Sequence, residues 1–273
     1  MISKHLFGCL SLVLLLSWPL LTPGQKREEG DRTRESFLDT RPKQAVAHGG
    51  KSAKSPPTKR PPSVGPIGIG YTLYKQSPEG NPVRVSSSQE FRQEDRLRLM
   101  IEPNITGHLY VFNSENDGLP EMIFPNPRLN GGDNRIEAHV PIEVPSREEA
   151  NPVNRWFEVQ GEPATEHLYL IITRTPLEGV PTGVKLLAHC RGKSGECAWQ
   201  PAATAWSQLA AKVDAAVPAN QEAGFGQKLA TVERQAVERK IALPPSAPAP
   251  SVIKMNQSPQ AKMLVTVIDL IHK

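Results

Sequence analysis

Short runs of alternating apolar and polar residues dominate the chain between residues 71 and 175. The run Arg96–Glu102 is the clearest, with Leu97, Leu99 and Ile101 at every second position and three charged residues on the opposite side. Side chains alternate between the two faces of a β-strand, so this spacing predicts a half-buried strand. Gly, Pro, Asn and Asp residues interrupt the runs at short intervals, as in the turns between antiparallel strands. The block is therefore predicted to be an antiparallel β-domain.

Two further runs indicate how the strands are layered. Residues 168–172 are apolar on both faces, which predicts a central strand buried between two layers. Met263–His272 is also strongly apolar, and because a free strand of this kind would aggregate, we expect it to close the fold beside an N-terminal strand. We predict a mainly β fold, an antiparallel β-sandwich of Ig-like or jelly-roll type. The remaining strands are predicted at Tyr71–Lys75, Val83–Val85, His108–Phe112, Glu121–Phe124, Arg135–Val144, Trp156–Val159 and, extending the central run, Leu168–Thr173.

The composition changes after residue 180, where the pattern predicts two or three peripheral helices before the closing strand. A short helix is expected over Pro181–His189, with Thr182 at its N-cap. Two longer helices are expected over Ala202–Val217 and Gln227–Leu243. Their apolar faces are weak, so we expect them to pack on the sandwich rather than form a coiled coil. The predicted domain covers residues 65–273, with the helical insertion at about 181–245.

The N-terminus resembles a secretory signal peptide. Lys4 precedes an apolar run over Leu6–Leu21, and the small residues Thr22 and Gly24 stand where a signal peptidase reads its substrate. The run is shorter than the roughly 20 apolar residues that span a bilayer, which disfavours a membrane anchor. We therefore expect residues 1–24 to be removed and the mature protein to be periplasmic or secreted, without membrane insertion.

The positive charge is concentrated near the N-terminus. The formal net charge is +4, but residues 26–62 hold ten Lys/Arg and five Asp/Glu, whereas residues 63–273 hold 21 and 23. A nucleic-acid-binding domain carries its basic patch on the fold, so no nucleic-acid partner is expected. Residues 25–64 are predicted to be a disordered, basic, Pro-rich linker. It would act as a spacer or make weak contact with anionic envelope polymers.

Two cysteines follow the leader, Cys190 and Cys197, and an even pair in an oxidising compartment predicts a disulfide. His189 beside the first of them leaves zinc as an alternative. A structural zinc site needs four ligands in paired short spacings, and the sequence holds no second Cys/His pair. No metal or other cofactor is therefore expected.

The sequence holds no Gly-x-Ser-x-Gly, His-Glu-x-x-His or glycine-rich phosphate-binding motif. His108, His139 and His167 fall in or beside predicted strands, where an alternating sheet position explains them without chemistry. Glu148 and Glu149 are adjacent, so their side chains are expected to point apart. We therefore expect no enzyme, and a hydrolase site assembled from the three histidines is the alternative.

Two loops are the candidate ligand-binding sites, because scaffold-held loops are where binding residues concentrate. Asn113, Glu115 and Asp117 alternate before a glycine, as at the start of a calcium loop. The twelfth position of such a loop would be Phe124, which supplies no carboxylate, so a hairpin turn is the better interpretation. The second loop is rich in glycine and contributes two candidates, Asn130 and Asp133.

Six motifs follow one another along the β-block: Gly70–Tyr74 (GYTLY), Glu94–Leu99 (EDRLRL), Gly107–Phe112 (GHLYVF), Gly118–Asn126 (GLPEMIFPN), Asn130–Arg135 (NGGDNR) and Thr165–Leu170 (TEHLYL). In this order they resemble the bacterial family of domains of unknown function numbered 4384, over roughly residues 65–174. Family members resemble accessory domains of secreted proteins, signalling kinases or caspase-like peptidases, and the resemblance implies a β-fold and a module role without assigned catalytic residues. The expected function is thus a non-catalytic module that binds an envelope protein or polymer, with a structural spacer as the alternative.

Overall fold

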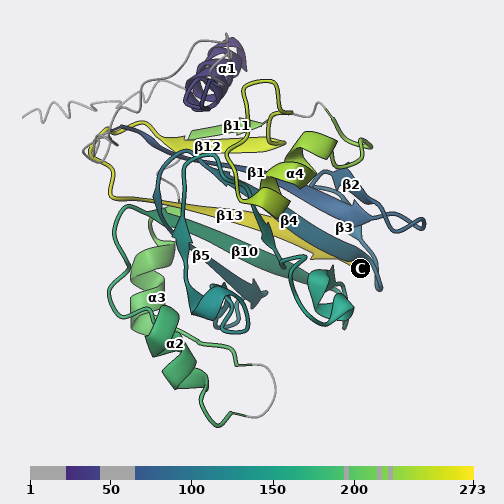
Figure 1. Cartoon of the computed structure of the whole chain (residues 1–273), viewed down its shortest axis with the longest axis vertical. Coiled ribbons are helices and arrows are strands. Elements are labelled where there is room, and N and C mark those ends of the chain that lie inside the picture. Colours follow the sequence, from purple (N-terminus) through teal and green to yellow (C-terminus); the bar gives the residue numbers. More distant parts are fainter. Residues whose placement is uncertain (1–22, 44–64, 194–196, 214–216, 221–223) are drawn as a thin grey trace, which may run out of the picture.

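A computed structural model describes residues 23–43, 65–193, 197–213, 217–220 and 224–273. Two sheets pack face to face, which confirms the predicted mainly β sandwich (Figure 1). The first, sheet A, has the order β11-β12-β1-β4-β8, with β2 beside β1 and β9 beside β4. Its strands are β1 (Ile67–Gln76), β2 (Pro82–Val85), β4 (Arg96–Pro103), β8 (Ile142–Val144), β9 (Phe157–Glu158), β11 (Val217–Asn220) and β12 (Val252–Asn256).

Sheet B has the order β3-β13-β10-β5-β6, with β7 beside β5. All strand pairs of both sheets are antiparallel except β3 with β13. The strands of this sheet are β3 (Glu90–Phe91), β5 (Gly107–Glu115), β6 (Glu121–Phe124), β7 (Arg135–Ile136), β10 (Ala164–Thr173) and β13 (Met263–His272).

The core lies between the sheets and follows the alternation of the sequence. On β4, Leu97, Leu99 and Ile101 face inward as predicted. The central strand β10 is buried on both faces, with Leu170 in the main core and Ile171 in a second apolar cluster outside sheet B. Burial of each such side chain contributes about 1.5–3 kcal/mol, so these strands carry much of the stability.

Helices cover the outer faces of both sheets (Figure 1). α2 (Gly183–Cys190) and α3 (Ala203–Ala210) lie over sheet B, where Leu186 and Trp206 pack against the second cluster. α4 (Thr231–Arg239) lies over sheet A, where its Val237 and the preceding Leu229 belong to a small apolar cluster with one residue each of β1 and β4. Thr182 occupies the N-cap of α2 as predicted, although its side chain makes no capping hydrogen bond.

α3 and α4 are shorter than predicted. α3 ends at residue 210 instead of 217, because the chain next supplies β11 to sheet A. α4 begins after residue 230 instead of at 227, because the preceding backbone is bonded to β2: Gln227 O accepts from Arg84 N, and Leu229 N donates to Pro82 O. It ends at residue 239, since Lys240 takes a left-handed conformation with φ +52°.

The strand predictions need correction at several places. Residues 135–144 form two short strands, β7 and β8, because His139 between them has a left-handed backbone with φ +61°. β3, β11 and β12 were not predicted as strands. The closing strand β13 has the predicted bounds, but it pairs with β10 and β3, and β12 takes the place beside the N-terminal strand β1.

The N-terminal segment also differs from the prediction, because part of the expected disordered linker is an ordered helix, α1 (Pro23–Leu38). Phe37 is fully buried against Ile253 and Met255 of β12. It fits there because β1 presents glycines on this face: a Cβ at Gly68 would lie 2.9 Å from the Phe37 ring, and one at Gly70 would lie 3.3 Å from it. The rest of the predicted linker, residues 44–64, and the predicted leader up to residue 22 lie outside the described residues.

A buried ion pair anchors the same segment. Arg41, 2% exposed, donates through Nε and Nη2 to the two carboxylate oxygens of Glu102 at 2.8 and 2.7 Å. Arg41 also donates to the carbonyl oxygens of Ala247 at 2.7 Å and Pro248 at 3.0 Å. His139 completes the cluster, with Nδ1 2.8 Å from Glu102 Oε1. The polar face of β4 is therefore buried here, which corrects the half-buried strand expected from the sequence.

The predicted disulfide between Cys190 and Cys197 is confirmed, with 5.5 Å between the two Cα atoms. It joins the end of α2 to the segment that reaches β6, where Met122 N donates to Trp199 O at 2.8 Å. Of the helices that the structure describes, none is long and apolar enough to cross a bilayer.

Candidate ligand-binding groove

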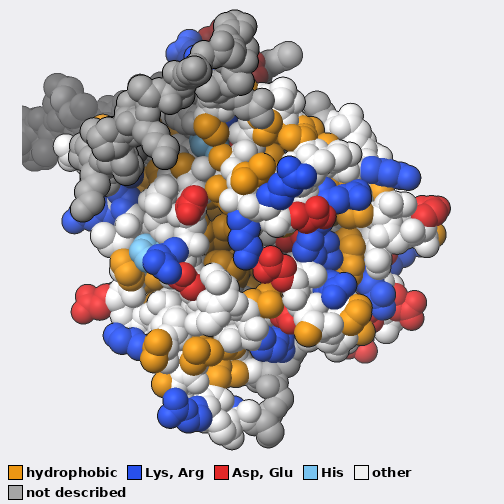
Figure 2. Space-filling view, viewed as in Figure 1, with side chains coloured by type: hydrophobic (Ala, Val, Ile, Leu, Met, Phe, Trp, Pro, Cys, Tyr) orange, Lys and Arg blue, Asp and Glu red, His pale blue; other side chains and the backbone are white. Residues whose placement is uncertain are grey.

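A groove runs along one open side of the sandwich. β6 and β7 form the edge of sheet B here, β8 and β9 form the edge of sheet A, and all four contribute to the lining. Its volume is about 1660 Å³. Figure 2 shows the hollow in this face, with hydrophobic side chains in its depth and charged side chains around it. The groove thus lies where the edges of the two sheets part, and no strand of the described residues closes it.

The floor of the groove is apolar and continuous with the core. Phe124, Ile142 and Phe157 are half-buried, line the groove and pack against the main core cluster. Nearer the rim, Val153 is 62% exposed and Leu187 of α2 is 41% exposed. An apolar surface that is already part of the core is rigid, and it gains free energy from any apolar group that covers it.

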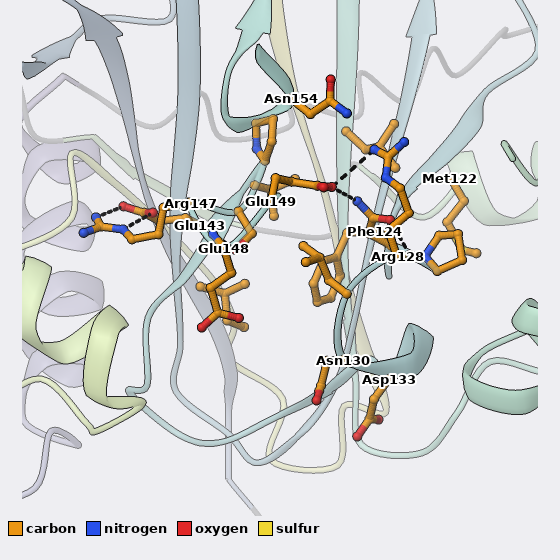
Figure 3. A pocket seen from close by; sticks show the side chains of 18 of the residues that line it. Met122, Phe124, Arg128, Asn130, Asp133, Glu143, Arg147, Glu148, Glu149 and Asn154 are labelled. Atoms are coloured by element: carbon orange, nitrogen blue, oxygen red, sulfur yellow. Dashed lines mark hydrogen bonds and ion pairs between the residues drawn. The ribbon is translucent and has the colours of Figure 1, made fainter. Parts of the chain in front are cut away.

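The charged side chains around the floor are paired with one another (Figure 3). The buried carboxylate of Glu149 accepts hydrogen bonds from Asn126 Nδ2 and from Arg128 Nη2, the latter at 3.2 Å. Glu148 lies instead 3.4 Å from Lys240 Nζ. The two adjacent carboxylates therefore point apart, as the sequence predicted.

A second pair joins the groove to α4. Arg147 donates to Glu143 through Nε at 2.6 Å and through Nη2, and its Nη1 donates to Glu238 Oε1 of α4 at 3.2 Å. The hydrogen bond to Glu143 raises the pKa of Arg147, whereas partial burial of the guanidinium lowers it. The positive charge is thus fixed in position by two carboxylates.

A third pair lies at the 3-10 helix η1 (Asn130–Gly132). Asp133 accepts from Arg135 Nε at 2.9 Å, and its carboxylate lies 2.7 Å from Arg135 Nη2. The hydrogen bond from Arg135 is the main reason why the pKa of Asp133 lies below its usual range. His108, the histidine of the lining, has Nδ1 3.1 Å from Asn134 Oδ1.

The structure separates the two predicted binding loops. Asn130 and Asp133 line the groove, whereas Asn113, Glu115 and Asp117 do not. They lie at opposite ends of β5 (Gly107–Glu115), whose rise of about 3.3 Å per residue puts roughly 26 Å between its first and last residues. The two loops therefore do not form one site, and only the second stays a candidate.

The first loop is a hairpin turn between β5 and β6, which is the interpretation that the sequence favoured over a calcium loop. Gly118 N donates to Glu115 O at 2.9 Å, and Asn116 takes a left-handed conformation with φ +49°. Asn113 donates to Glu166 Oε2 at 2.9 Å. No group of three His, Cys, Asp or Glu side chains suited to a metal ion occurs among the residues that the structure describes.

The three histidines weighed for a hydrolase lie apart. His108 is at the start of β5, opposite Thr173, and His167 pairs with Ser114 near the other end of that strand. His167 Nδ1 lies 2.7 Å from Asp269 Oδ1, while His139 is buried beside Glu102. The three rings therefore belong to different parts of the sandwich.

Most of the residues that line the groove belong to one recognisable part of the chain. Residues 90–176 match the family model described as Domain of unknown function (DUF4384). The DUF4384 match confirms the resemblance seen in the motifs, although it begins at residue 90 rather than 65, after β1 and β2. It contains β6, β7, β8 and β9, whereas Leu187 and the end of α4 that complete the groove lie outside it. No curated protein and no solved structure matches the chain.

Proposed function

We propose that this chain is a non-catalytic, secreted or periplasmic interaction module whose groove holds an extended segment of a partner protein. The observation that carries the proposal is that edge strands of both sheets border one groove with a floor that belongs to the core. The Cys190–Cys197 disulfide and the apolar leader are compatible with a location outside the cytoplasm.

An extended peptide suits this geometry for two reasons. A strand edge offers backbone N–H and C=O groups to which an added strand bonds, while alternate side chains of the peptide enter pockets below. β8 pairs with β4 on one side, and no described strand pairs with its other side. The volume of about 1660 Å³ also exceeds the 300–1,000 Å³ typical of small-molecule pockets.

The pairing of the groove's charges supports a binding role over a catalytic one. A general base needs a lone pair aimed at the substrate. In the groove, Glu149 and Asp133 instead accept hydrogen bonds from neighbouring side chains. Ser146 Oγ accepts from Glu148 N at 3.1 Å and has no histidine partner among the described residues.

Peptide selection followed by charge substitution tests the proposal. Ten-residue peptides displayed on phage are selected against the wild-type protein, and their affinities are measured by fluorescence anisotropy. Leu187→Asp places a charge on the groove, whereas Val184→Asp, the matched control, places one on the same helix at a residue that is 81% exposed and does not line the groove. Both positions are exposed, so both variants should melt close to the wild type.

We expect Leu187→Asp to weaken the selected peptides at least tenfold and Val184→Asp to leave them unchanged. The proposal fails if the two variants behave alike, or if no selected peptide binds the free protein. Such a result would favour a spacer domain.

A further inference from the structure

A second pocket, of about 420 Å³, lies on the outer face of sheet A beside α4. Four arginines line it: Arg98 from β4, Arg147 from the loop after β8, Arg155 from the 3-10 helix η2 (Pro152–Arg155) and Arg234 from α4. Trp156 forms part of the wall. The positive charges therefore come from four separate segments that the fold brings to one place.

Arg98 is held rigidly at this pocket. Its side chain points away from the core and is only 6% exposed. Nε and Nη2 both donate to Arg155 O, at 2.9 and 2.6 Å, and the guanidinium lies 4.0 Å from the centre of the Trp156 ring. The third nitrogen, Nη1, forms an ion pair with Glu143 Oε2 at 3.5 Å, a distance longer than a typical hydrogen bond. Nη1 therefore donates no hydrogen bond to any residue that the structure describes.

The neighbouring charges do not neutralise the cluster. Arg155 donates through Nε to Glu149 O, and Arg234 has no side-chain hydrogen bond or ion pair with any residue that the structure describes. Two carboxylates, those of Glu143 and Glu238, stand against the four arginines, and both are already bonded to Arg147. The pocket therefore carries an excess of two positive charges.

The excess positive charge affects the pKa of Arg98, the buried arginine of the pocket. Burial lowers the pKa of Arg98, Glu143 raises it, and the positive charges of Arg147 and Arg155 lower it again. A bound anion would oppose both of the lowering effects, because it replaces lost hydration and neutralises neighbouring charge.

We propose that this pocket binds an oxyanion, the carboxylate or phosphate group of a small molecule. Guanidinium forks match both groups through paired N–H···O bonds, and the volume lies within the range of small-ligand sites. Trp156 and Leu229 supply an apolar wall for the rest of the molecule. The site adjoins the groove, since Arg147, Trp156 and Glu238 line both, but it does not depend on what the groove holds.

Calorimetric titration of the whole protein with sodium phosphate and with sodium succinate tests the site, with sodium chloride at matched ionic strength as the reference. Arg234→Gln removes one charge from the pocket without breaking an internal pair. Arg239→Gln is the matched control, because it removes an exposed charge from the same helix outside the pocket.

We expect saturable binding of phosphate or succinate that Arg234→Gln weakens at least fivefold and Arg239→Gln does not change. Saturation with phosphate alone would assign a phosphorylated ligand, and saturation with succinate alone would assign a carboxylate. Leu187→Asp in the groove should leave this binding intact, which separates it from the peptide proposal. Binding no stronger than that of chloride, or equal effects of the two arginine substitutions, would overturn the inference.

Discussion

Breaking the buried ion pair between Arg41 and Glu102, which anchors the N-terminal segment, should strongly lower stability. Arg41→Ala removes the guanidinium that bonds both oxygens of Glu102 and three backbone carbonyls. It leaves the Glu102 carboxylate, whose side chain is 2% exposed, with His139 as its remaining partner. Breaking a buried ion pair on one side typically costs about 3–5 kcal/mol, a large part of the 5–15 kcal/mol that stabilises a domain.

Urea unfolding followed by tryptophan fluorescence measures this loss. With a slope of about 2 kcal/mol per molar urea, the unfolding midpoint should fall by roughly 1.5–2.5 M. Arg32→Ala is the control, because Arg32 pairs with Glu28 on the exposed surface at 3.5 Å, and such pairs contribute about 0.5 kcal/mol or less. Replacing both partners, Arg41→Met with Glu102→Leu, should recover much of the loss, since no uncompensated charge then stays buried.

The reasoning is refuted if Arg41→Ala and Arg32→Ala unfold at the same urea concentration. The segment 23–43 would then be undocked in solution, and the outer face of sheet A would be covered in some other way.

Two further predictions concern the core. Burial raises the pKa of the Tyr71 phenol, and the nearby Asp269 raises it further. Above about pH 10 this phenol therefore loses its proton in the unfolded chain but keeps it in the folded state. The free energy of unfolding then falls by about 1.4 kcal/mol per pH unit because of this one group. Tyr71→Phe should therefore flatten the fall in unfolding free energy between about pH 10.5 and 11.5 by that amount, and an unchanged slope would show that the hydroxyl is hydrated in the folded state. Deleting Ala261–Lys273 removes Leu264, Ile268 and Leu270 from the core and exposes β10, so light scattering should show aggregation. A monomer with the wild-type melting temperature would show that β13 is not part of the sandwich.

Strands with a local signature were predictable from the sequence. Leu97, Leu99 and Ile101 specify the inner face of β4 because side chains of a strand alternate whatever its neighbours are. β10 and β13 were found because an apolar run that faces both ways has to be buried. What these patterns leave open is strand order, which explains why β13 was placed beside the wrong strand.

The N-terminal helix was missed because its partners are remote. Residues 23–38 have the polar composition of a linker, with Phe37 and Leu38 as the only large apolar residues. The receiving site for Phe37 exists because Gly68 and Gly70 lack side chains on the outer face of β1, and composition does not reveal a gap of this kind. Arg41 likewise gains its partner from a strand 61 residues away.

The groove was missed for a related reason. The candidate loops were chosen for their turn residues, and those at Asn113–Gly118 serve the hairpin at the far end of β5. Glu143 and Glu149 gave the sequence a weak indication of the groove, because they are charged residues close to apolar strand positions. Their common site depends on which strands lie at the edges of the two sheets, and that is a property of the whole fold.

The docking of α1 also sets an order of events during synthesis. Phe37 and Arg41 are made early, whereas Ala247, Ile253 and Met255, against which they lie, are made more than 200 residues later. At about 5–20 residues per second, this separation corresponds to roughly 10–40 seconds. The described helix that is made first is thus among the last elements that can dock, and any factor that acts on it during synthesis meets it undocked.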